Sequence, residues 1–89
     1  MKNKLIYIEW EDACSNDKWM DEAEAEHWAH AERYLVKQVG FVWREDKKHI
    51  VLFGGVYDSG EFMNQYHNFI KIPKAWIRKR IDLTRFIKK

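Results

Sequence analysis

The stretch IKIPKAWIRKRIDL, residues 70–83, indicates how the last part of the chain is built. Pro73 has no N–H to donate to a strand ladder, so a strand should end there. The four residues IPKA, 72–75, are enough for one tight turn. After this turn, Ile77, Ile81 and Leu83 lie on one side of a second extended segment. This stretch therefore predicts two strands that are separated by a single turn.

Three further runs of the sequence are typical of β-strands. Residues 4–10 alternate between apolar and polar side chains, and so do residues 35–45. The run at 49–57 is almost continuously apolar, which implies burial on both faces, and its two adjacent glycines favour a bulge or a sharp bend. Residues 64–72 supply the strand that ends at the proline. Five strands are therefore expected.

A helix is predicted between the first two strands. Asp21 with Glu24 three positions later forms a capping-box arrangement, and the residues from 22 to about 33 are strong helix formers. A moderately apolar stripe along this segment predicts a surface helix that lies across another element. The stripe consists of Met20, Ala23, His27, Trp28 and Ala31.

The order of these elements predicts a mainly β domain, α+β by content: a small SH3-like five-stranded barrel with a helix inserted in the first long loop. Closure would remove the exposed edges that a short β-protein must otherwise protect. The main alternative is an α+β domain whose helix packs across an open antiparallel sheet. A second variant makes residues 74–88 a basic helix. The sequence has no repeat or linker, so residues 1–89 are expected to form a single small domain.

The amino-acid composition limits the classes of protein to which this chain can belong. The 89 residues are 46% hydrophobic and 16% aromatic, a rich supply for so short a chain. The single cysteine, Cys14, cannot form an internal disulfide, which favours a reducing compartment. The sequence shows no signal peptide and no apolar run long enough to cross a bilayer, so we expect a cytoplasmic protein without membrane contact.

Charge is distributed unevenly along the chain. Residues 1–32 carry three basic and nine acidic side chains, whereas residues 33–89 carry thirteen basic and five acidic ones. Such asymmetry can indicate a tail that binds a polyanion. The explanation that we favour is that acidic and basic segments face each other within the fold or across a dimer.

Several short motifs together resemble a type of small protein. They are EWEDA at 9–13, VGFVWRED at 39–46 and IPKAWI at 72–77. The chain is similar in these motifs to small uncharacterised phage and prophage accessory proteins. The resemblance implies an accessory protein without a recognised catalytic residue, acting in the host cytoplasm, and an anti-defence role would suit such a gene.

Candidate catalytic and metal-binding groups are few. His27 and His30 are three apart on the predicted helix, and with Cys14 or Glu26 they would supply the ligand types of a metal site. No second close pair of ligands accompanies them, so we predict no metal and no cofactor. Cys14 has no evident base to activate it. The sequence therefore predicts a protein that is not an enzyme.

Two groups of residues could instead form a binding surface. Glu9 and Glu11 share one face of the first strand, and Asp12 follows them, which makes an acidic lip better suited to contact than to catalysis. Exposed aromatic side chains beside basic ones could stack on a base or anchor a protein partner. The candidates of this second kind are Trp76, Arg78, Arg80, Tyr57 and Tyr66, with Trp19 as a further exposed aromatic residue.

The function expected from the sequence is stoichiometric binding of a host protein or a small ligand. The alternative is a small nucleic-acid-binding domain that uses the basic C-terminal strand and tail. In that case binding should be weak or non-specific, because the acidic half of the chain opposes the field of the basic half. The sequence is also compatible with association into a homo-oligomer.

Overall fold

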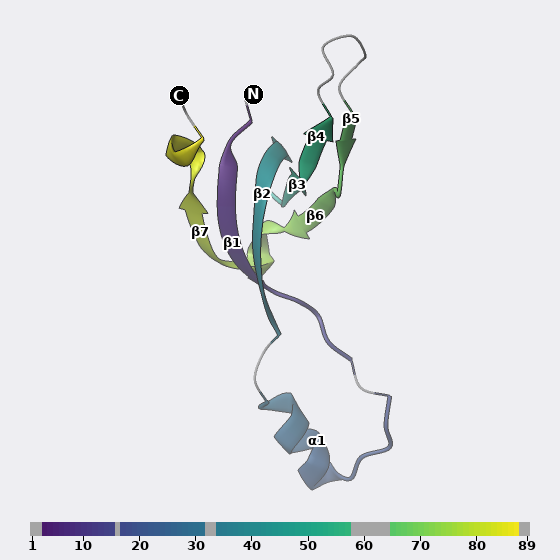
Figure 1. Cartoon of the computed structure of the whole chain (residues 1–89). Helices are drawn as coiled ribbons and strands as arrows, with labels where there is room; N and C mark the ends of the chain where they lie inside the picture. The colour runs from purple at the N-terminus through teal and green to yellow at the C-terminus, as the bar shows by residue number, and fades with distance from the viewer. Residues whose placement is uncertain (1–2, 16, 32–33, 58–64, 88–89) are drawn as a thin grey trace.

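The computed structural model describes residues 3–15, 17–31, 34–57 and 65–87 (Figure 1). The elements in chain order are β1 (Leu5–Glu11), α1 (Glu22–Ala29), β2 (Leu35–Glu45), β3 (His49–Phe53), β4 (Gly55–Tyr57), β5 (Gln65–His67), β6 (Ile70–Pro73) and β7 (Ile77–Asp82). Two short 3-10 turns, η1 (Lys74–Trp76) and η2 (Thr84–Phe86), flank β7.

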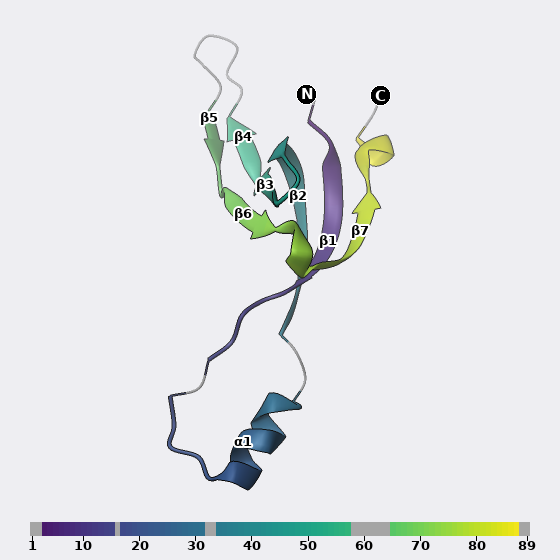
Figure 2. The same ribbon diagram turned by 180° about the vertical axis from the view of Figure 1, so that it is seen from behind.

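Five strands form one antiparallel sheet in the order β6-β3-β2-β1-β7 (Figures 1 and 2). The prediction of a mainly β fold with a helix after the first strand is therefore confirmed. The predicted strand at 64–72 is divided between β5 and β6 at Asn68, whose φ of 59° is left-handed. The apolar run at 49–57 is divided into β3 and β4 at Gly54. The ribbon formed by β4 and β5 is a separate two-stranded sheet.

The large sheet is curled, because its two edge strands are joined by a very short connection. β6 and β7 lie at opposite ends of the strand order, yet only the three residues of η1 separate them in sequence. A flat five-stranded sheet would be about 19 Å wide between its edge strands, too far for so short a link. Among the described residues no ladder pairs β6 with β7, so backbone hydrogen bonds do not close the sheet into a barrel.

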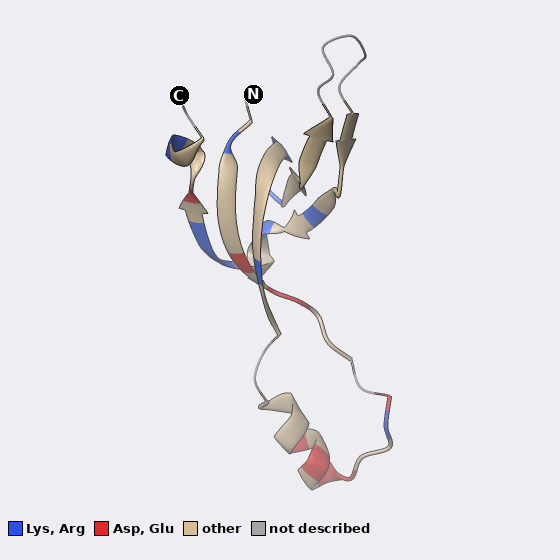
Figure 3. Ribbon diagram, in the orientation of Figure 1, with Lys and Arg blue, Asp and Glu red and all other residues tan. Residues whose placement is uncertain are grey.

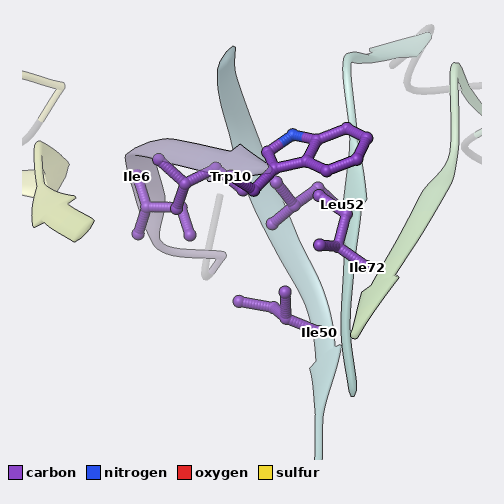
Figure 4. Packing of buried hydrophobic residues seen from close by; sticks show 6 residues of the cluster. Ile6, Trp10, Ile50, Leu52 and Ile72 are labelled. Atoms are coloured by element: carbon purple, nitrogen blue, oxygen red, sulfur yellow. The ribbon is translucent and has the colours of Figure 1, made fainter. Parts of the chain in front are cut away.

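The core lies on the inner, concave face of this sheet. Alternate residues of β1, Ile6, Ile8 and Trp10, are buried there and face buried residues of β3 and β6 (Figure 4). Gly40 of β2 lies on the same face opposite Ile6, and a Cβ at this position would approach the Leu52 Cβ to 3.1 Å. The cluster consists of Ile6, Ile8, Trp10, Ile50, Leu52 and Ile72.

A second, aromatic cluster lies on the outer face of β2 and β3. Phe53 is only 1% exposed and stands at its centre, with the Tyr66 ring of the β4–β5 ribbon 5.0 Å away edge-to-face. The rings of Phe41, Trp43 and Phe69 also contact Phe53. The sheet is thus packed on both sides at this end.

Between β1 and β2 the chain leaves the sheet and returns to it. We call residues 12–34 the arm, of which 16, 32 and 33 lie outside the described residues. The Asp12 N–H donates to the Tyr34 carbonyl oxygen over 2.8 Å, which holds the two ends of the arm together. With α1 at its far end the molecule measures 61 × 25 × 22 Å. Its radius of gyration is 17.8 Å, against about 12 Å for a compact domain of this length.

The expectation that the helix lies across another element is wrong. None of the eight residues of α1, all of them described, is buried, and Figure 1 shows the helix well away from the sheet. The predicted stripe consists largely of alanines and histidine, which offer little apolar area, while acidic side chains surround it. The alternative in which the helix covers an open sheet is wrong for the same reason. So is the basic helix at 74–88, since residues 74–86 form η1, β7 and η2.

Candidate functional site

The helix of the arm begins where the sequence predicts. Asp21 is the N-cap, and its side chain accepts a hydrogen bond from the Glu24 N–H over 2.8 Å. The helix ends at Ala29, earlier than the predicted end near residue 33, and the His30 N–H closes it on the Glu26 carbonyl oxygen. A helix of two turns in water has little stability of its own.

The arm exposes aromatic side chains to an unusual extent. Trp19 is fully exposed, Tyr34 is 63% exposed and Trp28 is 37% exposed. A hollow of about 470 Å³ lies along one side of the helix, and Trp19 and Met20 line it with His27. Single exposed apolar residues are ordinary, but three large aromatic side chains on one small projection are not.

A second hollow, of about 360 Å³, lies between the end of the helix and the base of the arm. Its lining includes Glu11 and Asp12 of the predicted acidic lip, together with Cys14, Trp28 and Tyr34. The acidic lip is therefore the point where the arm joins the sheet.

The arm is also strongly acidic, as the red segments in Figure 3 show. Its described residues carry one basic side chain, Lys18, against six acidic ones. These six are Asp12, Asp17, Asp21, Glu22, Glu24 and Glu26. An exposed surface that combines aromatic rings with carboxylates is suited to protein contact rather than to a polyanion.

An ion pair joins the acidic lip to the basic last strand. Arg78 Nε donates to Glu11 Oε1 over 2.7 Å, and Arg78 Nη1 donates to the Ala75 carbonyl oxygen over 2.7 Å. Glu9 accepts a hydrogen bond from the Tyr7 hydroxyl, which raises the pKa of Tyr7, and it lies opposite Lys79 of β7. At these positions acidic and basic segments face each other within the fold.

Arg80 is paired with Glu45 and not with the acidic lip. Its Nη1 and Nη2 donate to the two carboxylate oxygens of Glu45 over 2.8 and 3.1 Å, and Lys74 Nζ lies 2.7 Å from the same carboxylate. Arg80, followed by Lys74, lowers the pKa of Glu45 to about 2. Glu45 lies at the end of β2, so these contacts join β2 to β7 and η1 where no strand ladder does.

The remaining predicted residues lie in separate places. Trp76 stacks on Trp10 with ring centroids 6.3 Å apart and an interplanar angle of 19°, and 37% of it is exposed beside Arg78. Tyr57 and Tyr66 belong to the β4–β5 ribbon, Tyr57 being 63% exposed. The structure thus joins Arg78 to Glu11 at the base of the arm and stacks Trp76 on Trp10, but it does not bring the whole predicted set together.

Sequence reasoning missed Trp28 and Tyr34 as exposed residues of the arm, and Trp43 and Phe69 as exposed residues of the sheet. The sequence pattern places Trp28 in an apolar stripe and Trp43 in the alternating strand at 35–45. One signal could have identified Trp28: the stripe around it contains too few large apolar residues to support burial.

The described residues contain no group of three or more His, Cys, Asp or Glu side chains placed to hold a metal ion. His30 Nδ1 lies 2.9 Å from the Glu26 carbonyl oxygen, so this ring is engaged with its own helix. Cys14 is exposed. Among the described helices there is also none whose length and hydropathy would allow it to cross a bilayer.

Removal of metal should leave the protein unchanged. We expect purification in the presence of a chelator to leave the thermal midpoint of unfolding where it is, because the core is apolar and no ligand cluster among the described residues contributes to it. Calorimetric scans with and without chelator check this. Stoichiometric zinc that is lost together with the folded state would instead assign Cys14, His27 and His30 as ligands.

Comparisons with protein-family models, with curated proteins and with solved structures found no match to this chain.

Proposed function

We propose that this chain is a non-enzymatic binding protein without a cofactor, and that the arm is the element that engages a protein partner. The observation that carries the proposal is the exposure of Trp19, Trp28 and Tyr34 on a projection whose helix buries nothing. An eight-residue helix is marginal in water. A partner that covered these rings would supply the packing that the chain itself does not.

The side chains of the arm indicate what kind of partner surface could bind it. Tryptophan and tyrosine are the residues that most often contribute binding energy in the centre of protein interfaces. Six carboxylates around them favour a partner with an apolar groove and a basic rim. A small ligand in the hollow at the base of the arm is a second candidate, since about 360 Å³ is at the lower end of ligand-pocket volumes.

The sheet acts in this proposal as the scaffold of the arm, and we assign it to the SH3-like barrels. The strand order and the single 3-10 turn before the last strand support this assignment. The ion pairs of Glu45 with Arg80 and Lys74 connect the end of β2 to the edge strand β7 and to η1, which supports a curled, barrel-like sheet. Such a scaffold would fix the base of the arm while leaving its tip accessible.

The resemblance to phage accessory proteins suggests a host protein as the partner. A protein of this size that occupies a surface of a host protein in the cytoplasm could block that protein's own contacts, which is one way to counter a defence system. The exposed aromatic and acidic surface of the arm supports stoichiometric binding of this kind.

Nucleic-acid binding through the basic C-terminal strand has less support. Arg78 and Arg80 are both paired, with Glu11 and Glu45 respectively. Phosphates would have to displace these carboxylates before either arginine could contribute counterion release.

Capture of partners from a host lysate tests the proposal. The double variant Trp19→Ala/Trp28→Ala should retain about tenfold less partner than the original protein, because two aromatic anchors are removed. Quantitative mass spectrometry of the captured proteins, with and without nuclease, provides the measurement. Neither tryptophan belongs to the core, so the double variant should unfold at the same temperature as the original protein.

Phe86→Ala is the matched control. Phe86 is 68% exposed and lies on η2, the turn that follows β7, rather than on the arm. This variant should capture the partner as well as the original protein does. Equal capture by the arm variant, or capture that nuclease abolishes, would refute binding through the arm.

A further inference from the structure

A second exposed aromatic site lies on the outer face of the sheet, apart from the arm. Trp43 of β2 is 45% exposed and Phe69, next to β6, is 49% exposed. Their ring centroids are 5.6 Å apart at an interplanar angle of 90°. Trp43 is also held by Tyr66, whose centroid is 4.8 Å away, and by Phe53 at 5.9 Å. The exposed indole is therefore supported from within the sheet.

Two basic side chains flank these rings. Val51 of β3 lies opposite Arg44 of β2 on one side and opposite Lys71 of β6 on the other. Val51 follows the buried Ile50 and precedes the buried Leu52, so this row points to the outer face. Neighbouring strands are about 4.8 Å apart, which puts the backbones of Arg44 and Lys71 about 10 Å apart.

Within the described residues, Arg44 and Lys71 form no ion pair and donate no side-chain hydrogen bond. Arg78, Arg80 and Lys74 differ in this respect, since each is paired with a carboxylate. Arg44 and Lys71 on β2 and β6 could therefore meet an external anion without breaking an ion pair, whereas Arg78 and Arg80 of the C-terminal strand could not.

The rings and the cations line one hollow of about 330 Å³. Asp46 at its rim is the one acidic residue in the described lining, and its carboxylate accepts hydrogen bonds from the Lys48 and His49 N–H groups, each over 2.8 Å. These bonds tie the Asp46 carboxylate to the β2–β3 turn, and together with the smaller effect of the His49 and Lys71 charges they lower the pKa of Asp46. Arg44 and Lys71 outnumber this one carboxylate in the hollow.

We propose that this outer face of β2, β3 and β6 binds single-stranded nucleic acid. Bases stack on Trp43 and Phe69, while Arg44 and Lys71 contact the phosphates on either side. Stacking rings beside cations are the combination that proteins use for single strands, because every base has a π-face and every nucleotide a phosphate. A duplex keeps its bases stacked on each other, so it offers nothing to these rings.

Fluorescence anisotropy of a labelled twelve-nucleotide oligothymidylate, titrated with the full chain at several salt concentrations, tests the proposal. The double variant Arg44→Glu/Lys71→Glu should bind about tenfold more weakly at low salt, because two attractive charges beside the phosphates become repulsive. The slope of log K against log salt should fall by about 1.4, which is about 0.7 for each phosphate of a single strand that the protein no longer neutralises. Phe69→Leu should weaken binding several-fold and leave this slope unchanged.

Lys37→Glu/Lys79→Glu is the matched control. These lysines flank Glu9 on the outer face of β2, β1 and β7 in the same three-strand geometry. Their row forms no part of the aromatic hollow. This control carries the same change of charge and should alter the affinity less than about twofold. The arm variant Trp19→Ala/Trp28→Ala should bind the oligonucleotide normally, so this test is independent of partner binding by the arm.

Three results would overturn the proposal. One is the absence of binding at low salt, and another is an equal loss of affinity in the two charge-reversal variants. The third is a self-association of the protein that Arg44→Glu/Lys71→Glu abolishes while oligonucleotide binding is unaffected. That result would assign the face to the acidic arm of a second copy.

Discussion

Replacing Trp10 by alanine should lower the free energy of unfolding by about 3–5 kcal/mol, the usual cost of deleting a large aromatic side chain from a core. Trp10 is 8% exposed and packs with the buried isoleucines of β1 and the residues facing them. Its ring stacks on Trp76, and its Nε1 donates to Gln38 Oε1 over 3.2 Å. The variant therefore loses apolar burial, ring stacking and a hydrogen bond together. Urea denaturation followed by circular dichroism measures the change.

Two other tryptophans provide controls for this prediction. Trp76→Ala should cost less than Trp10→Ala, because the outer ring of the stacked pair is already 37% exposed. Trp19→Ala should change the free energy by no more than about 0.5 kcal/mol, as for an ordinary surface position. If Trp10→Ala cost less than Trp76→Ala, the core would lie elsewhere than on the concave face.

Replacing Glu45 by glutamine should cost about 2 kcal/mol at neutral pH. The lowered pKa of Glu45, about 2 against an ordinary 4.5, corresponds to roughly 3 kcal/mol, which we reduce because water screens a pair that is partly exposed. The variant leaves Arg80 and Lys74 facing each other without the carboxylate that both contact. The end of β2 would then lose its ion pairs to β7 and η1.

The effect of this substitution should vanish in acid. The pKa of Glu45 is lower in the folded than in the unfolded protein, so its ionised form stabilises the fold above about pH 5. That contribution is lost as the pH falls from about 4.5 towards 2, the pKa of the folded state. Asp46 and Asp82 also have lowered pKa values, but both proteins contain them and their contributions cancel in the comparison.

Urea midpoints of the original protein and Glu45→Gln at pH 7, 4 and 2.5 provide the measurement. The difference between the two proteins should be largest at pH 7 and should fall to about a quarter of that value at pH 2.5, which is still slightly above the folded pKa. A difference that stays constant over this range would show that the glutamine acts through packing and not through the missing charge.

The strands of this protein could be predicted because their pattern is local. The alternation of Ile6, Ile8 and Trp10 and the stop at Pro73 depend on neighbours in sequence, and both are found in the structure. The division of the fourth strand at Asn68 could not be predicted, since a left-handed residue other than glycine carries no reliable local signal. Nor could the position of the helix, which depends on whether the sheet offers it a surface.

The candidate site was less predictable than the fold. Basic residues are densest in the C-terminal strand, but the sequence does not show that Glu11 and Glu45 occupy Arg78 and Arg80. Arg44 and Lys71 are isolated in sequence and come together only through pairing of β2, β3 and β6. Long-range pairing thus decides which cations can meet an external ligand.

The hydrogen bond that joins the two ends of the arm has a consequence for how this protein can change over time. Glu11 pairs with Leu35 directly beside that bond, so the sheet needs only that its first two strands meet at this point. The free-energy cost of closing a loop rises by only about 0.6 kcal/mol for each doubling of the loop's length. Insertions, deletions and replacements beyond the closing bond are therefore tolerated while the strands keep their register. The tip of the arm can therefore acquire a new binding specificity during evolution while the sheet stays unchanged.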